Sequence, residues 1–247
     1  MLTFFKSKPV LKDLIPDNHV DIHSHLLWGI DDGARTFEDT LRLTKALQGF
    51  GISQLITTPH IIEHVWDNSP VLIKAKKADT LIELGKHQIK IPFHAAAEYM
   101  MDDHFVQLFQ GGALLTLKDN YVLVEMSYIN PPIQLYSILF DLQLAGYIPV
   151  LAHPERYLFY HQNLEEYQKL KKAGCLFQLN LLSVVGYYGD GIAKIAEKLL
   201  QKDMYSFVGS DVHHDNHVAA FNQKVKLKDW TPLKEAIANN QFFRMEE

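Results

Sequence analysis

The sequence predicts an α/β protein in which parallel strands are joined by crossover helices, as in a doubly wound sheet or a closed β/α barrel. Seven short apolar runs alternate with segments whose apolar residues recur at helical spacing. This alternation is typical of parallel sheets. With 247 residues, 47% of them hydrophobic, the chain can build one sizeable core. We therefore expect a single domain over 1–247, in which 1–18 form an extension before the first strand.

Each expected strand is a short apolar run with β-branched residues. The seven runs are His19–His23, Gln54–Thr58, Ile91–Ala97, Tyr121–Val124, Ile148–Ala152, Leu176–Leu179 and Ser206–Gly209. Helical spacing is clearest in 41–47, 133–144 and 192–200. Thr36 followed by Asp39, and Asn163 followed by Glu166, are typical of helix starts. No glycine-rich phosphate-binding motif follows a strand, which disfavours a nucleotide-binding open sheet.

Composition excludes several classes of protein. The chain has 24 Lys and Arg against 29 Asp and Glu, a formal charge of −5, and no basic tail, which argues against a nucleic-acid partner. It has no secretory segment and no run of about 18 apolar residues, so we expect a cytoplasmic protein without membrane insertion. Its single cysteine cannot form an internal disulfide.

Metal-ligand residue types stand where six of the seven expected strands end, at the face that carries the active site in both architectures. They are His23, His25, His60, Glu98, Glu125, His153, Asp211 and His213, and Asp32 lies in the first loop. Side chains alternate along a strand, so His23 and His25 point to the same side. The strand ending at Asn180 lacks an obvious ligand.

So many ligands exceed what one ion can use, because imidazole and carboxylate sites for Zn, Mn or Fe take few protein ligands per ion. Four carboxylates would share the pocket: Asp32, Glu98, Glu125 and Asp211. Their mutual repulsion opposes folding unless cations compensate. Three divalent ions would leave a surplus of two positive charges, which suits a phosphate ester.

Several motifs together resemble the PHP (polymerase and histidinol phosphatase) superfamily. More narrowly, they are similar to the bacterial metal-dependent tyrosine-protein phosphatases of capsular and exopolysaccharide synthesis. The motifs are Asp21-Ile22-His23-Ser24-His25, Gly29-Ile30-Asp31-Asp32-Gly33, Thr57-Thr58-Pro59-His60, Ala97-Glu98-Tyr99, Ala152-His153-Pro154-Glu155-Arg156 and Gly209-Ser210-Asp211-Val212-His213. The resemblance runs from about residue 19 to about residue 217.

The resemblance implies a distorted TIM-like (β/α)7 barrel of the PHP fold with three divalent ions, most often manganese, with iron or zinc as alternatives. The first ion would be held by His23, His25, Glu98 and Asp211. Glu98 would bridge to a second ion held by Glu125 and His153, and Asp32, His60 and His213 would hold the third. Arg156 resembles the phosphate-binding arginine, and Arg156, Asp211 and His213 are the expected catalytic residues.

The sequence departs from the family after the Asp-x-His motif. Relatives often have an arginine a few residues further on, whereas this chain reads His214-Asp215-Asn216-His217. We expect His217 or Arg35 to take its place in substrate binding.

The implied reaction is hydrolysis of phosphotyrosine by in-line attack of a hydroxide that bridges two metal ions. The implied substrate is a bacterial tyrosine kinase that controls polysaccharide synthesis or export. Cys175 lacks an arginine six positions later and starts an apolar run, so we interpret it as a buried hydrophobic residue rather than a nucleophile. The alternatives are a small-molecule phosphatase such as histidinol phosphatase, an amidohydrolase-type metal hydrolase, and a catalytically inactive scaffold.

Two further groups of residues are candidates for supporting roles. Asp21 and Asp31 could orient ligand histidines from behind. Four tyrosines that follow strand ends could stack on an aryl phosphate or pack at the rim of the pocket. They are Tyr128, Tyr157, Tyr187 and Tyr188, and we favour rim packing.

Overall fold

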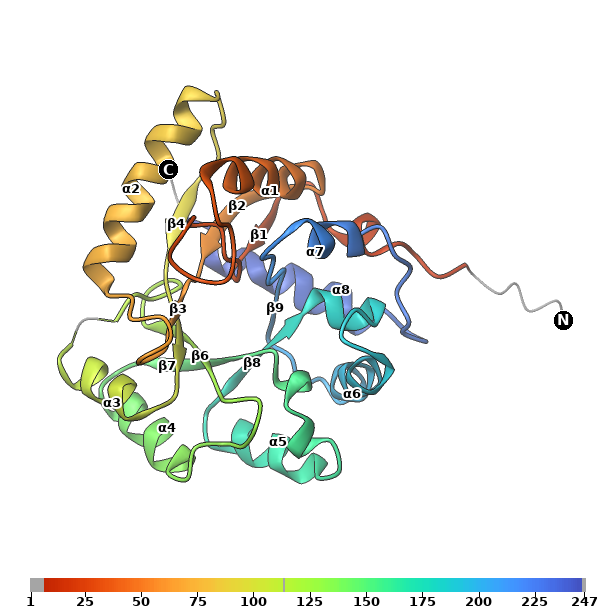
Figure 1. Ribbon diagram of the computed structural model, residues 1–247. Coiled ribbons are helices and arrows are strands. Elements are labelled where there is room, and N and C mark those ends of the chain that lie inside the picture. The colour runs from red at the N-terminus through yellow and green to blue at the C-terminus, as the bar shows by residue number, and fades with distance from the viewer. Residues whose placement is uncertain (1–6, 113, 246–247) are drawn as a thin grey trace, which may run out of the picture.

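The strands of this computed structural model, which describes residues 7–112 and 114–245, form two parallel sheets (Figure 1). One sheet has the order β1-β2-β4 and the other the order β3-β5-β6-β7-β8-β9. The bounds are β1 His19–Asp21, β2 Ile52–Thr57, β3 His60–Ile61, β4 Phe93–Ala95, β5 Glu98–Met100, β6 Tyr121–Glu125, β7 Ile148–Ala152, β8 Leu176–Asn180 and β9 Phe207–Gly209. The predicted parallel α/β class is confirmed.

The helices surround the strands (Figure 1). The α-helices are α1 Phe37–Gly49, α2 Pro70–Lys86, α3 Asp103–Gln110, α4 Leu135–Leu144, α5 Leu164–Lys172, α6 Asp190–Gln201, α7 Asp215–Ala220 and α8 Thr231–Asn239. Thr36 and Asp39 form the predicted capping box of α1, but the Asn163 side chain does not cap α5. Across the described part of the chain, no helix is both long and apolar enough to cross a membrane.

Side chains alternate between two apolar clusters. On β6, Val122 and Val124 join the large cluster shared with the helices, whereas Leu123 joins a smaller cluster on the opposite face of the strands. The same alternation on β8 sends Phe177 and Leu179 toward the helices and leaves Gln178 on the other side, buried. Polar residues on this second face are thereby held near the ends of the neighbouring strands.

The closed barrel implied by the sequence is not confirmed, because the described strands form no continuous ring. Two short strands follow predicted ones and were not predicted: β3 comes after β2 and Thr58-Pro59, and β5 comes after β4 and Ala96-Ala97. As a result β2 pairs with β4, whereas β3 pairs with β5. Proline lacks the N–H that a continuous ladder needs, which explains the first break.

Side-chain and loop contacts join β1 to β9 where no ladder forms. Asn240, in the 3-10 helix η5 (Asn240–Phe243), donates to Val20 O at 2.8 Å and to Val208 O at 2.9 Å. At the carboxyl ends of the strands, Asp211 N–H donates to His23 O at 2.8 Å. These bonds place the segments after β1 and β9 side by side.

The described part of the expected N-terminal extension packs onto the fold. The 3-10 helix η1 (Leu11–Leu14) has Leu11 fully buried, and Leu11 N–H donates to Gln223 O at 2.9 Å. Residues 1–6 lie outside the described range. The described residues of the extension, from residue 7 onward, therefore contribute to the core beside 221–225.

Candidate metal centre

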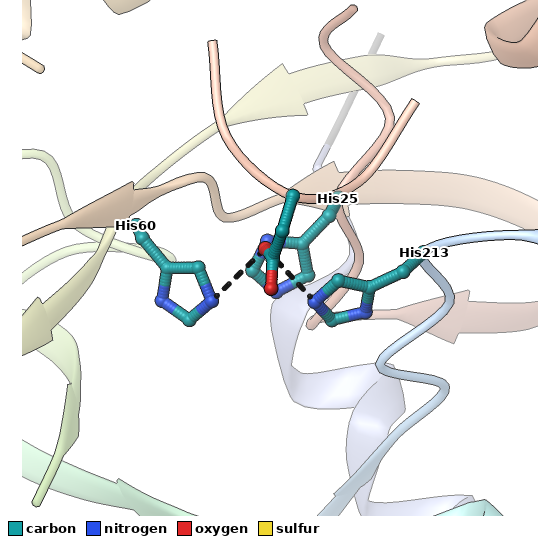
Figure 2. Close-up of side chains that lie close together, drawn as sticks. His25, His60 and His213 are labelled. Carbon is teal, nitrogen blue, oxygen red and sulfur yellow. Dashed lines mark ion pairs between the residues drawn. The ribbon is translucent and has the colours of Figure 1, made fainter. Parts of the chain in front are cut away.

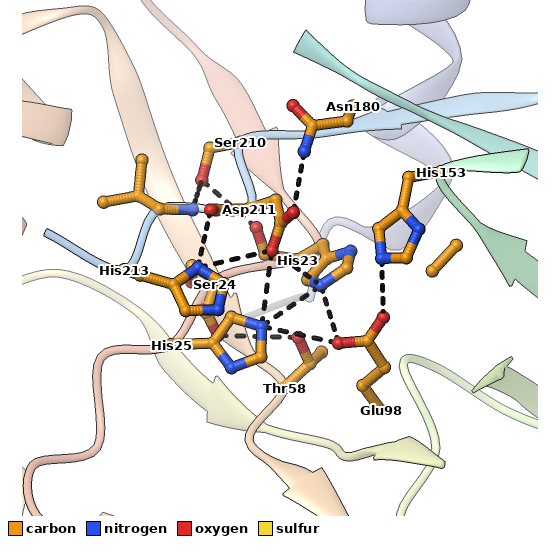
Figure 3. A network of polar contacts seen from close by, with 12 residues as sticks. His23, Ser24, His25, Thr58, Glu98, His153, Asn180, Ser210, Asp211 and His213 are labelled. Atoms are coloured by element: carbon orange, nitrogen blue, oxygen red, sulfur yellow. Dashed lines mark hydrogen bonds and ion pairs between the residues drawn. The ribbon is translucent and has the colours of Figure 1, made fainter. Parts of the chain in front are cut away.

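The carboxyl ends of the strands surround a pocket of about 300 Å³. Its lining consists of imidazoles, carboxylates, one guanidinium and two phenols: Asp32, His60, Glu98, Tyr128, His153, Arg156, Tyr188, Asp211, His213, His214 and His217. Figure 3 shows the buried part of the cluster, in which His23 and His25 project beside Glu98 and Asp211. The predicted ligands therefore come together, although they originate from strands far apart in the sequence.

Four ligand atoms form the tightest group. His23 Nε2 lies 3.2 Å from His25 Nε2, 3.1 Å from Glu98 Oε2 and 3.2 Å from Asp211 Oδ1. His25 Nε2 is 3.5 Å from the same Glu98 oxygen and 3.4 Å from the same Asp211 oxygen. Two atoms that each lie about 2.1 Å from one ion are about 3.0 Å apart at a right angle and about 3.4 Å apart at the tetrahedral angle. His23, His25 and Asp211 thus have the spacing of ligands of one ion, and Glu98 Oε2 adjoins them through the two imidazoles.

A second group surrounds His60 Nδ1, which lies 2.8 Å from Glu125 Oε1 and 3.3 Å from Glu98 Oε2. His60 Nδ1 and Glu125 Oε1 are buried, and neither forms a hydrogen bond with a described residue. His153 Nε2 approaches the other oxygen of Glu98 at 3.1 Å. Glu98 therefore stands at the centre, with one oxygen toward His153 and the other toward His23 and His60.

The third group has Asp32 between two imidazoles. Asp32 Oδ1 is 3.5 Å from His60 Nε2 and 3.4 Å from His213 Nε2, the two ion pairs drawn in Figure 2. His25 stacks on His213 with ring centroids 3.9 Å apart and completes the group. Asp32 is the exposed member, so this group lies at the mouth of the pocket.

The grouping differs in part from the one that the resemblance implied. The first group contains the expected His23, His25 and Asp211, but Glu98 groups with other ligands; the third contains the expected Asp32, His60 and His213, and also His25. For the second ion, however, the structure places Glu125 with His60 and Glu98, and His153 with His23 and Glu98. Within the described residues, no group contains both Glu125 and His153.

The electrostatics of the pocket favour positive charge at the imidazoles. Burial by itself lowers the pKa of His60, but the carboxylates of Glu125 and Glu98 outweigh it and raise that pKa to about 9. Burial acts to raise the pKa of Glu98, yet His23 and His60 hold it well below its usual range. A cation between the ligands would take over the charge compensation that protons otherwise provide. The donor set and its field therefore fit divalent metal ions.

Polar side chains behind the ligands fix their orientation. Asp31 Oδ2 lies 2.8 Å from His25 Nδ1, so the predicted orienting role of Asp31 agrees with the geometry. Asp21 accepts from Ser210 Oγ at 2.6 Å, and Ser210 Oγ lies 3.1 Å from His23 O, so Asp21 supports the backbone at His23 through Ser210 rather than through the imidazole.

Sequence reasoning missed the contributions of β8. Gln178 Oε1 lies 2.8 Å from His23 Nδ1, and Asn180 Nδ2 donates to Asp211 Oδ2 at 2.7 Å. The signal was present, because these two polar residues alternate at i and i+2 in an otherwise apolar strand. The strand without a ligand thus positions ligands of its neighbours.

The backbone is unusual at two of the ligands. His153 has φ +35° and Asp211 has φ +49°, a left-handed conformation that costs free energy in residues other than glycine. Close packing also restricts Gly33, where an added Cβ would lie 2.2 Å from His25 O, and Gly209, where it would lie 2.6 Å from His23 Cβ. The unfavourable backbone angles and the close packing thus occur at, or directly beside, the residues that orient the ligand side chains.

Arg156 is held at the edge of the pocket between two aromatic rings. Its Nη1 donates to Asp211 Oδ2 at 2.9 Å. The guanidinium carbon lies 4.8 Å from the centre of the Tyr128 ring and 4.2 Å from that of Tyr188. Such contacts stabilise a guanidinium while leaving its edge available to an anion. Tyr128 and Tyr188 line the pocket, whereas Tyr157 is fully buried.

The two expected substitutes for the second arginine occupy different places. His217 lines the metal pocket, and its Nδ1 accepts from His213 N–H at 3.2 Å. Arg35 lines an adjacent pocket of about 250 Å³ that shares Asp32 and His213 with the first. Cys175 is buried away from both pockets, and burial raises its pKa to about 12.

Comparisons with known proteins agree with this site. The profile of the family described as "Capsular polysaccharide synthesis, CpsB/CapC" matches residues 19–225. The tyrosine-protein phosphatase YwqE of Bacillus subtilis is 33% identical over 200 residues, which cover 79% of this chain and 77% of YwqE. The tyrosine-protein phosphatase CpsB of Streptococcus pneumoniae is 26% identical over 204 residues, which cover 79% of this chain and 83% of CpsB.

A solved structure matches as well. It comes from crystallographic work on YwqE from Bacillus subtilis and CpsB from Streptococcus pneumoniae, described there as unique metal-dependent tyrosine phosphatases. The TM-score is 0.75 at 28% sequence identity, and the match covers 91% of this chain and 88% of the other.

Proposed function

The chain belongs to the capsular polysaccharide synthesis family CpsB/CapC, and from this membership we propose that it is a metal-dependent protein-tyrosine phosphatase. One observation carries the proposal: all nine expected ligands lie in linked groups around one pocket whose wall includes Arg156. The phosphatase names and the metal dependence of the relatives point to the same chemistry. The chain is therefore assigned to the phosphoric monoester hydrolases.

Three divalent ions, most often manganese, would occupy the three groups of ligands. His23, His25, Glu98 and Asp211 would hold the first ion, and Asp32, His60 and His213 would hold one near the mouth. Glu98, Glu125 and His153 would hold the remaining ion, which requires Glu125 and His153 to approach each other on binding, because they lie in separate groups on either side of Glu98. The single domain would be a distorted (β/α)7 barrel opened between β1 and β9, which the bonds of Asn240 to both strands support.

Bound ions of this kind lower the pKa of a water ligand and polarise phosphoryl oxygens, which is the chemistry that ester hydrolysis needs. The protein residues position the substrate. Arg156 would donate to two phosphoryl oxygens, a geometry to which its planar fork is suited. Asp211 fixes the guanidinium through the bond to Nη1, and His213 would hold the ion at the mouth of the pocket beside the phosphate. His217 and Arg35 would add a donor or a charge at the rim.

The physiological substrate would be a bacterial tyrosine kinase that controls polysaccharide synthesis or export. The family description and the names of the relatives support this class of substrate. The pocket also fits, because Tyr128 and Tyr188 provide aromatic walls for a phenyl phosphate.

The test is a comparison of turnover by the manganese-loaded protein on a phosphotyrosine peptide and on histidinol phosphate. We expect a kcat/KM at least about a hundredfold higher for the peptide, because a phenyl ring has aromatic walls to contact. A preference for histidinol phosphate would replace the proposal with a small-molecule phosphatase. Inactivity of the metal-loaded protein on both substrates would contradict phosphatase activity altogether.

A further inference from the structure

Exposed apolar side chains gather in the segment that follows β6 and in α4. Six of the thirteen large, exposed apolar residues of the described chain lie between positions 128 and 144. They are Tyr128, Ile129, Ile133, Tyr136, Phe140 and Leu144. The last three follow one another at a spacing of four along α4, so they form a stripe on one side of this helix. Such a concentration on a surface is typical of an interaction site.

A hollow of about 450 Å³ lies between α3, α4 and the loop that joins β6 to α4. We call it the α3–α4 hollow; its wall includes Met100, Met101, Ser127, Ile133 and Ile138. Ile133 is fully exposed, whereas Met101 and Ile138 are buried at its base. An apolar floor with flexible methionines can accept aliphatic side chains of different shapes.

The hollow and the metal pocket are lined by neighbouring residues of the chain. Ser127 lines the hollow, and the next residue, Tyr128, lines the metal pocket. On β5, Glu98 faces the metal pocket, whereas Met100 lines the hollow. An extended peptide advances about 3.3 Å per residue, so a side chain within about three positions of a bound phosphotyrosine can reach the hollow.

The rim of the hollow is acidic. Asp102 caps α3 by accepting from Phe105 N–H at 2.8 Å, and Asp103 is exposed beside it. Neither forms an ion pair with any residue in the described ranges. Because the whole chain carries −5, this rim does not attract a second copy, but it attracts a basic segment.

We propose that the α3–α4 hollow docks the polypeptide substrate beside its phosphotyrosine, taking an aliphatic side chain on its floor and a Lys or Arg at Asp102 and Asp103. This inference rests on the proposed phosphatase function. It explains how an open metal pocket that binds a small aryl phosphate also selects among protein segments. The metal pocket recognises the phosphate and its ring, and the hollow recognises the flanking sequence.

The test compares 4-nitrophenyl phosphate with two synthetic peptides on the manganese-loaded protein. One peptide has Leu and Lys on both sides of phosphotyrosine, and the other has Ser and Glu. We expect about tenfold higher kcat/KM for the Leu/Lys peptide, the order expected when one anchoring side chain and one charge pair are gained. Ile133→Ser should remove most of this preference, and Asp103→Lys should favour the Ser/Glu peptide.

The 4-nitrophenyl phosphate rates separate failure of docking from failure of the phosphatase function, because this substrate reports the metal pocket alone. Val71→Ser, which alters an exposed apolar residue on α2, is the matched control and should change none of the three rates. Equal rates for both peptides, or a preference that survives Ile133→Ser and Asp103→Lys, would overturn the docking proposal. A drop in mass by light scattering in Ile133→Ser, with the peptide preference unchanged, would assign the surface to a second copy instead. Hydrolysis of none of the three substrates would overturn the phosphatase function itself.

Discussion

His60 Nδ1 and Glu125 Oε1 lie 2.8 Å apart, yet neither atom forms a hydrogen bond within the described chain. The contact distance is that of two ligands at roughly a right angle on one ion, about 3.0 Å for metal–ligand bonds of about 2.1 Å. A buried nitrogen and oxygen without hydrogen bonds are costly unless another partner satisfies them. A divalent cation is the partner that suits both atoms, and it also compensates the charge of Glu125.

The Asp31 carboxylate should control metal affinity without contacting the metal. Asp31→Asn weakens the bond to His25 Nδ1 and loosens the orientation of that ligand. We expect the affinity for Mn²⁺ to fall about tenfold to a hundredfold, the usual effect of losing such a supporting carboxylate. Isothermal titration with Mn²⁺ measures it. Asp17→Asn, on an exposed loop, is the control, and equal affinities for all three proteins would show that Asp31 has no such role.

Arg156 should act on the phosphate rather than on the fold. Arg156→Lys keeps a positive charge but loses the planar fork, so we expect kcat/KM for an aryl phosphate to fall by about a hundredfold. Metal content, measured by plasma emission, should stay unchanged. The control is Arg42→Lys, which alters an arginine paired with Asp39 and Asp215 outside the metal pocket. If Arg156→Lys retained full activity, the phosphate would have to be bound elsewhere.

His19 should make the fold sensitive to acid. It is fully buried, neither ring nitrogen has a partner in the described chain, and burial together with nearby Arg244 lowers its pKa to about 3. In the unfolded chain the pKa of His19 has its ordinary value of 6.5. Between about pH 6.5 and pH 3 the unfolded chain therefore binds a proton at His19 that the folded chain does not bind. The free energy of unfolding should fall as pH drops from about 6.5 toward 3, by up to about 1.4 kcal/mol per pH unit.

The variant His19→Leu isolates this effect. Urea denaturation of the metal-free protein at pH 7 and pH 5 should show the variant gaining about 2 kcal/mol relative to the parent chain at the lower pH. His64→Leu, at an exposed position, should show no such gain. A constant difference between His19→Leu and the parent at both pH values would contradict a neutral buried imidazole.

The sequence predicted well which candidate ligands come together, because of a simple rule. In a parallel sheet the carboxyl ends of all strands meet at one face, so residues such as His23 and His153 can be brought together from the pattern alone. Their detailed grouping could not be predicted, because it depends on which oxygen of Glu98 faces which imidazole. The link from Asp21 through Ser210 could not be predicted for the same reason, since it joins residues 189 positions apart.

The interruption of the strands was also beyond sequence reasoning in part. Pro59 could have indicated the break between β2 and β3, whereas Ala96-Ala97 carries no such signal. The exposed stripe on α4 was hidden because apolar residues lie on more than one side of this helix. Periodicity alone does not show which of Ile138 and Phe140 faces solvent.

The most direct test of the metal cluster is metal quantitation on the purified protein, paired with aryl phosphatase assays before and after chelation. The account predicts close to three divalent ions per chain, loss of activity when they are removed, and recovery with Mn²⁺. Full activity in the metal-free protein would contradict it.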